Sequence, residues 1–344
     1  MKKIKVIIVD DSISIRTNLK KKLSKIDDIE VVATAPDPYA ARDKIVLLNP
    51  DIIILDIEMP KMDGLTFLEK IMNHFPKPVI IFSSFTTKGS KLALKALELG
   101  AVEVISKSDL TVGMGQSSDF IDDLKMKIYS AYNSKIQKTE TREEVAEYED
   151  INIRTTDKIV VIGASTGGTE AIKKILTPLP ENFPGIVIVQ HMPPNFTTRF
   201  AERLDELCRI KVKEAEDGDQ IVQGQALIAP GDQHILINKN GKKLYVTLNS
   251  GPKVHFQRPS VDILFKSASK VLKDKAIGII LTGMGRDGAS GLLELKKAGA
   301  QTLAQDRESS IVYGMPEEAV KIGAVDYELD IYKIPEKLIE ILNK

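Results

Sequence analysis

The stretch "KIVVIGASTGGTEAI", residues 158–172, joins a β-branched apolar run to a cluster of small residues around Ser165 and then to a helix-compatible segment. This pattern predicts a strand, a tight glycine turn and a helix, the unit from which doubly wound α/β sheets are built. The turn is compatible with two chemistries. It can expose a nucleophilic serine, or its backbone amides can bind a phosphate.

More units of the same kind follow this stretch. The runs "GIVIVQHMP", "QALIAPG", "AIGIILTGMG" and "GAQTLAQD" alternate with amphipathic segments, as parallel strands and their covering helices do. "HILINKNGKKLYVTLN" contains an Asn-Gly pair between alternating residues, which predicts a hairpin within this unit and hence a mixed sheet. We expect residues 157–344 to form a doubly wound α/β domain with a mostly parallel sheet.

A second set of strand candidates precedes it: "KVIIVDD", "IEVVATA", "PDIIILDIEMP", "PVIIFSS" and "AVEVISKS". Separated by helix-length segments, these five runs predict one doubly wound, flavodoxin-like parallel sheet in residues 1–130. Residues 131–156 are charged, nearly devoid of Gly and Pro and short of large apolar side chains, which is typical of a linker.

Composition restricts the class of protein. The 344 residues include 48 Lys plus Arg and 48 Asp plus Glu, so the balanced charge argues against nucleic acid as a partner. A single cysteine, Cys208, excludes an intramolecular disulfide and suits a reducing compartment. Without a run of about 18 apolar residues, membrane insertion is not expected. We therefore expect a cytoplasmic protein.

Polar residues end four of the five N-terminal strand candidates. Asp10 and Asp11 follow the first, Asp56 ends the third, Ser83 the fourth and Lys107 the fifth. Strand ends meet at one edge of a parallel sheet, so three carboxylates would repel one another unless a cation such as Mg²⁺ lay among them. A hydroxyl and a lysine beside them suit a phosphoryl group on a carboxylate. The alternative, that such acids merely cap helices, explains one position better than all five.

With the motifs "VDDS", "LDIEMPKMDGL", "PVIIFSS" and "ALELGAVEVISKS", the N-terminal region resembles a response-regulator receiver domain. The resemblance implies Asp56 as the phospho-acceptor and Mg²⁺ as the cofactor for phosphorylation. It implies Asp10, Asp11, Asp56 and the carbonyl of Glu58 as metal ligands. Ser83 and Lys107 would contact the phosphoryl group.

The central turn favours a nucleophile over a phosphate site. Gly163 to Gly167 fits G-x-S-x-G, the nucleophile elbow in which small residues leave the serine hydroxyl exposed. A Walker A loop would need lysine where Thr169 stands, and Glu170 in the first helical turn would repel a bound phosphate. A glycine-rich turn with a capping serine remains the structural alternative.

A nucleophilic serine needs a base and an acid that orients the base. His191 ends the strand candidate "GIVIVQH" and Asp287 lies just beyond "AIGIILTG", so each would lie at a different strand end. His234 and His255 stay open as alternative bases, and Asp287 is equally suited to cap the helix that follows it. The amides of Thr166 and Met284 are candidates for an oxyanion hole.

"GASTGG", "QHMPPNFT", "APGDQH", "RPSVDILF" and "LTGMGRDGA" make residues 157–344 resemble the catalytic domain of chemotaxis protein-glutamate methylesterases. The resemblance implies a phosphorylation-activated serine hydrolase, without a cofactor at the hydrolytic site. Its substrates would be glutamate methyl esters, and glutamines to be deamidated, on chemoreceptor cytoplasmic helices, with a chemotaxis histidine kinase as phosphodonor. The competing hypothesis is a two-component output protein whose second domain binds a nucleotide or partner without catalysis.

Overall fold

The computed structural model describes residues 3–59, 62–84, 86–107, 110, 118–136, 153 and 157–343. Two compact units divide at residues 141 and 142, and each is described by itself. The predicted linker, 131–156, lies largely outside the described residues, and the predicted domain limits stay predictions.

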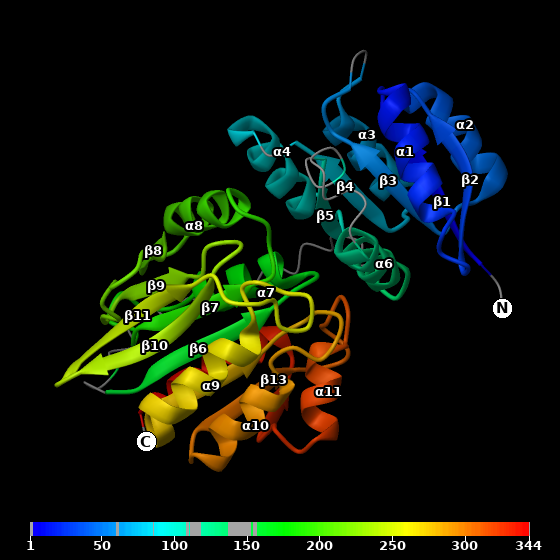
Figure 1. The fold of residues 1–344 in the computed structure, drawn as a ribbon. Coiled ribbons are helices and arrows are strands. Elements are labelled where there is room, and N and C mark those ends of the chain that lie inside the picture. Colours follow the sequence, from blue (N-terminus) through cyan, green and yellow to red (C-terminus); the bar gives the residue numbers. More distant parts are fainter. Residues whose placement is uncertain are drawn as a thin grey trace. The chain divides into compact units, whose positions relative to one another are not determined.

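The first unit is a five-stranded parallel sheet in the order β2-β1-β3-β4-β5, the flavodoxin-like arrangement predicted from the sequence (Figure 1). Its elements are β1 (Ile4–Val9), α1 (Ile13–Leu23), β2 (Ile29–Ala35), α2 (Pro38–Leu48), β3 (Ile52–Asp56), α3 (Gly64–His74), β4 (Val79–Ser83), α4 (Thr87–Glu98), β5 (Glu103–Ser106) and α6 (Ser118–Tyr132). Every residue of β3 and β4 is buried, as expected for strands covered by helices on both faces.

The second unit has a seven-stranded parallel sheet in the order β14-β13-β12-β6-β7-β9-β8. Its strands are β6 (Ile159–Ala164), β7 (Ile186–Gln190), β8 (Lys211–Glu214), β9 (Gln225–Ile228), β12 (Ala276–Ile280), β13 (Gln301–Gln305) and β14 (Tyr327–Leu329). Its helices are α7 (Gly168–Leu176), α8 (Phe196–Leu207), α9 (Val261–Val271), α10 (Ala289–Lys297), α11 (Met315–Lys321) and α12 (Ile334–Leu342), with short 3₁₀ turns at Lys273–Lys275 and Ile331–Lys333.

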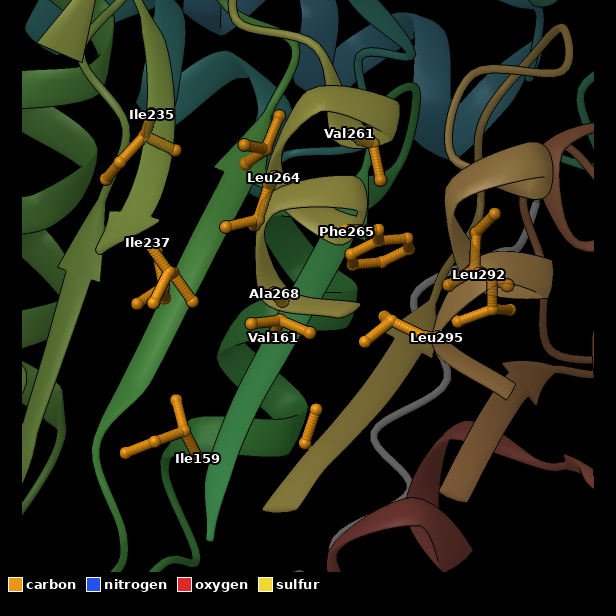
Figure 2. Packing of buried hydrophobic residues seen from close by; sticks show 14 of the residues in the cluster. Ile159, Val161, Ile235, Ile237, Val261, Leu264, Phe265, Ala268, Leu292 and Leu295 are labelled. Carbon is orange, nitrogen blue, oxygen red and sulfur yellow. The ribbon is translucent and has the colours of Figure 1, made fainter. Parts of the chain in front are cut away.

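The predicted hairpin is present as β10 (His234–Asn240) and β11 (Lys243–Asn249), but the expectation of a mixed sheet is wrong. The hairpin forms a two-stranded sheet of its own, and the pairings of the main sheet are parallel throughout the described strands. Side chains explain the separation. Ile235 and Ile237 of β10 belong to the hydrophobic core that also contains residues of α9, so β10 is held by packing, while β11 forms backbone hydrogen bonds to residues 218–221, outside the main sheet (Figure 2).

Helix α9 packs over the middle of the main sheet and determines where the site forms. Val261, Leu264 and Phe265 point from the helix into the core shared with Val161 of β6 (Figure 2). The first residue of the helix, Val261, is fully buried. Its N-terminus is thereby fixed beside the carboxyl end of β6.

Candidate active site and phosphorylation site

The turn at Ser165 depends on glycines for steric reasons. A Cβ on Gly163 would come within 2.1 Å of Val261 Cγ1, so this glycine admits helix α9. Gly167 has φ of 78° and forms the N-terminal boundary of α7, a conformation that side chains disfavour. The chain thus passes from a buried strand into a helix around Ser165, whose residue stays partly exposed. This is the elbow that the sequence predicted.

Sheet topology brings Ser165 and His191 side by side. β6 lies between β12 and β7, at the point where the order of winding reverses, and ligands of such sheets bind at that point. Ala164 pairs with Gln190 in the register of β6 and β7, so Ser165 and His191 follow a matched pair. The amide of His191 donates to the carbonyl of Ala164 at 3.0 Å. Among the described residues, the Ser165 hydroxyl has no hydrogen-bond partner, which leaves it available to a substrate.

Gln190 links the two backbones and was missed by the sequence reasoning. Its Nε2 donates to the carbonyl of Ser165 at 2.9 Å and to that of His191 at 3.2 Å. The side chain is buried, and its Oε1 has no hydrogen-bond partner in the described part of the chain. A Cβ on Gly168 would lie 2.1 Å from that oxygen, so the second glycine of "GG" leaves space for the Gln190 side chain.

Asp287 is held by four donors. His191 Nε2 lies 2.8 Å from Oδ2, which also accepts from the amide of Val261 at 2.8 Å. Oδ1 accepts from the Ser260 hydroxyl at 2.8 Å and from the amide of Asp262 at 3.1 Å. Burial alone would raise the pKa of Asp287, but the hydrogen bond and charge of His191, with those from Ser260 and Val261, hold it below its usual value. Asp287 is therefore ionised at neutral pH.

The alternative that Asp287 caps the helix following it is wrong. That helix, α10, begins after Gly288 without a side-chain cap. The carboxylate instead accepts from the first two amides of α9, 25 and 26 residues away in sequence. It stabilises the positive end of that helix while holding His191. Nothing local in the sequence marks this pairing, and Ser260 was consequently not identified.

The two predicted oxyanion donors flank Ser165. A Cβ on Gly283 would lie 2.7 Å from Ser165 Cβ, so the loop before Met284 approaches Ser165 closely. The Met284 amide has no acceptor within the described residues. The carbonyl of Thr166 accepts from the Thr282 hydroxyl at 2.9 Å, which anchors the peptide between Thr166 and Gly167.

The first unit has a buried ionic cluster at the carboxyl ends of β1, β3 and β5. Asp10 and Asp56 are each 1% exposed, and Lys107 Nζ lies 2.9 Å from Asp10 Oδ2 and 2.6 Å from Asp56 Oδ2. Burial raises the pKa of Asp56, and the nearby Lys107 offsets this only in part. Burial would lower the pKa of Lys107, but hydrogen bonding and charge from Asp56 and Asp10 raise it.

This cluster suits a divalent cation. Carboxylate oxygens of Asp10, Asp11 and Asp56 lie within 4.8 Å of one another. Apart from the Lys107 ammonium, the buried Oδ2 atoms of Asp10 and Asp56 have no donor in the described regions, so each retains acceptor capacity. Hard oxygen ligands in this number are what Mg²⁺ uses.

Ser83 and Glu58, two further predicted residues at this sheet edge, have hydrogen-bond partners of their own. Ser83 lies at the end of β4, buried, and its hydroxyl donates to the carbonyl of Gly89 at 3.2 Å. The Glu58 amide donates to Asp56 Oδ1 at 3.0 Å, and the Glu58 carboxylate accepts from Ser84 at 2.7 Å. The fold therefore gathers all six predicted residues at one sheet edge.

Comparison with known proteins finds a matching family for each of the two units. Residues 160–338 match the family described as CheB methylesterase, and residues 6–111 match the response regulator receiver domain. The chain belongs to the CheB methylesterase family. A protein-glutamate methylesterase/protein-glutamine glutaminase 2 of Syntrophus aciditrophicus (strain SB) is 52% identical over 99% of this chain and 100% of its own.

Further relatives agree with this assignment. The corresponding protein of Pectobacterium atrosepticum is 47% identical, over 98% of this chain and 97% of its own. The crystal structure of the Thermotoga maritima CheB methylesterase catalytic domain is 46% identical, with a TM-score of 0.53, and covers 55% of this chain and 100% of its own. This CheB-family chain is thus a methylesterase-type hydrolase joined to a receiver domain.

Two histidines that stayed open as bases have other roles in this chain. His234 is buried, with Nε2 2.9 Å from the carbonyl of Pro252 and Nδ1 accepting from the Ser260 amide at 3.1 Å. Both ring nitrogens are therefore occupied, Nδ1 by the Ser260 amide and Nε2 by the Pro252 carbonyl. His255 Nε2 lies 3.4 Å from Asp262 Oδ2, away from any hydrogen bond to Ser165. None of the described helices has the length and apolar character needed to cross a membrane.

Proposed function

We propose that Ser165, His191 and Asp287 hydrolyse glutamate methyl esters on the cytoplasmic helices of chemoreceptors and deamidate particular receptor glutamines. The observation that carries this is the bond between His191 and the fully saturated Asp287, at the strand end adjoining Ser165. Both reactions are acyl transfers at a side-chain carbonyl, and a serine, base and acid at adjoining strand ends suit them.

The ring nitrogens of His191 have separate tasks. Because Nε2 faces Asp287 at 2.8 Å, Nδ1 is the nitrogen that takes the Ser165 proton. Ser165 Oγ then bonds to the substrate carbonyl carbon, the C–O or C–N bond breaks, and the same proton leaves with methanol or ammonia. Water, deprotonated by Nδ1, cleaves the acyl-serine to give glutamate and free Ser165. The ionised Asp287 stabilises the imidazolium in both halves of the reaction.

The amides of Thr166 and Met284 stabilise the negative oxygen that develops on the carbonyl. The Met284 amide, without an acceptor within the described residues, is preorganised for this role by the close approach of its loop to Ser165. Removing one such donor typically lowers turnover about 10²–10³-fold.

Asp56 is the proposed phospho-acceptor, with a chemotaxis histidine kinase as donor. Asp10, Asp11, Asp56 and the Glu58 carbonyl would hold Mg²⁺, which neutralises charge on the transferring phosphoryl group when bound. Lys107, already within 2.6 Å of Asp56, pairs with a phosphoryl oxygen, and the Ser83 hydroxyl exchanges Gly89 for another. Phosphorylation then raises hydrolase activity.

Methanol release from methylated receptors tests the central claim. Ser165→Ala should abolish release, whereas Ser290→Ala, at an exposed position of α10, should match the parent chain. Retention of turnover in Ser165→Ala would exclude the serine mechanism. If a nucleotide raised the melting temperature equally in both variants, the binding-domain hypothesis would gain support instead.

A further inference from the structure

The turn from Val254 to Gln257 has an unfavourable backbone for the residues it contains. The amide of Val254 donates to the carbonyl of Gln257 at 3.0 Å, and the reverse bond is 2.9 Å. The two residues between them, His255 and Phe256, have φ of 50° and 65°. Such turns favour Asn-Gly, because a side chain clashes with its own backbone in the left-handed region. An aromatic residue there is a strained choice.

The ring of Phe256 does not offset this strain by burial, because the residue is 54% exposed. The turn is instead held from its base. Arg258 Nη1 donates to the carbonyls of Ser250 and Gly251 at 2.9 and 2.8 Å, and His234 binds the carbonyl of Pro252. Arg258 is itself fixed by Asp232 at 2.6 Å. The fold therefore maintains a strained turn that presents an aromatic ring to its surroundings.

The turn lies next to the proposed triad. His255 Nε2 is 3.4 Å from Asp262 Oδ2, and one ligand atom each of His255, Asp262 and Asp287 lies within 4.8 Å of the others. Asp287 in turn holds His191. An exposed ring one residue from His255 is thus within reach of a protein segment whose side chain enters the site.

We propose that Phe256 is a substrate-docking residue, whose ring packs on an apolar side chain of the helical protein segment that carries the modified glutamate. On a helix, residues three or four apart share a face, so an apolar residue one turn from the ester meets the ring while the ester reaches Ser165. His255 and Asp262 hold the turn in register with the triad. This inference rests on the proposed function and names a specificity contact for it.

Removal of the ring separates docking from folding. Phe256→Gly relieves the φ strain, so the variant should melt at the same or a higher temperature than the parent chain. Its KM for the methylated receptor should rise about tenfold, as expected for loss of an aromatic anchor, while kcat stays within about twofold. Phe256→Tyr keeps the ring and should retain the parent KM. Val222→Ala removes an exposed apolar residue beside Gly185, before β7 and so at the opposite edge of the sheet, and should also leave KM unchanged.

A short substrate isolates the contact further. The γ-methyl ester of an N-acetylglutamate amide has no neighbouring helical turn, so Phe256→Gly should hydrolyse it at the parent kcat/KM. An unchanged receptor KM in Phe256→Gly would overturn the docking role. So would raised basal turnover at constant KM, which would assign the ring to restraint of the unphosphorylated enzyme. Failure of the parent chain on the receptor, or retained activity in Ser165→Ala, would instead refute the proposed function itself.

Discussion

Asp56 and Asp287 are aspartates at or beyond the carboxyl ends of parallel strands, 1% and 2% exposed, and the two sites treat their carboxylates in opposite ways. Asp287 accepts from four donors and its pKa is held low. Asp56 has one amide donor, an ion pair and a neighbouring carboxylate, and burial raises its pKa.

The difference follows from what each carboxylate is proposed to do. A group that orients a histidine works best when every lone pair is fixed, because rotation would misplace the imidazole. A group that receives a phosphoryl must keep an oxygen available, and its unsatisfied charge is what a cation and a phosphoryl transfer relieve. A carboxylate whose acceptor sites are all hydrogen-bonded is held rigidly. A carboxylate with acceptor sites left over can react with a phosphoryl group and change state.

The largest expected effect comes from removing the charge of Asp287. Asp287→Asn should lower kcat for methanol release about 10⁴-fold, because the imidazolium loses its counter-charge and the favoured tautomer. Asp274→Asn, at an exposed site before β12, is the matched control and should keep the parent kcat. A decrease below about tenfold in Asp287→Asn would show that saturation of this carboxylate serves folding alone.

A smaller effect is expected when one donor is removed and Asp287 is made more like Asp56. Ser260→Ala deletes the 2.8 Å bond to Oδ1 and should lower stability by about 1–3 kcal/mol. The pKa of Asp287 should rise, so the acid limb of the kcat profile should move to higher pH. Ser260→Thr keeps the hydroxyl and should restore the profile. Equal profiles for the alanine and threonine variants would contradict an orienting role.

Neutralising Asp56 should raise stability, whereas removing a donor to Asp287 should lower it. Asp56→Asn removes a buried charge that burial disfavours, and should stabilise the first unit by about 1 kcal/mol in metal-free buffer. The variant should also lose its activation by phosphodonors. Amide hydrogen exchange in β3 and β4 of the full chain reports the stability of this unit. Faster exchange in the variant would show that Asp56 is satisfied by Lys107 and is not poised to react.

The smallest effect is an acid response of opposite sign in the two units, which falls in a different pH range for each. The lowered pKa of Asp287 means that its contribution is present above the ordinary value of 3.8 and is lost as pH falls through the lower folded value. The raised pKa of Asp56 means that its contribution is present below 3.8 and is lost as pH rises through the higher folded value.

Hydrogen exchange from pH 7 towards 4, compared between the parent chain and Asp56→Asn, checks this response. Between 3.8 and its higher folded pKa, Asp56 should stabilise the first unit on acidification, by at most about 1.4 kcal/mol per pH unit for one proton. Mg²⁺ should remove the gain, because the cation lowers the pKa of Asp56. A gain that persists in Mg²⁺ or in Asp56→Asn would come from another group.

Much of the fold follows from short-range patterns. Apolar runs alternating with helix-length segments, together with the glycine turns, predicted both doubly wound sheets, because buried parallel strands require continuous apolar runs. The Asn-Gly pair predicted the hairpin. The edge strands β8 and β14 were not identified, since "KVKE" and "YEL" are short and half-polar. The separate position of the hairpin was also missed, because it depends on packing against α9 and on hydrogen bonds from β11 to residues 218–221, which no local pattern marks.

The sequence by itself determined which residues have reactive chemistry and that each stands at a strand end, because strand periodicity and glycine turns are local properties. Only the tertiary structure decided how these residues are supported. Asp287 binds the N-terminus of α9 and Gln190 ties Ser165 to His191, while His234 supports Ser260. These partners are up to 27 residues apart, and neutral or capping residues of this kind have no periodic signature. Their roles arise from packing, which brings distant lone pairs and donors together.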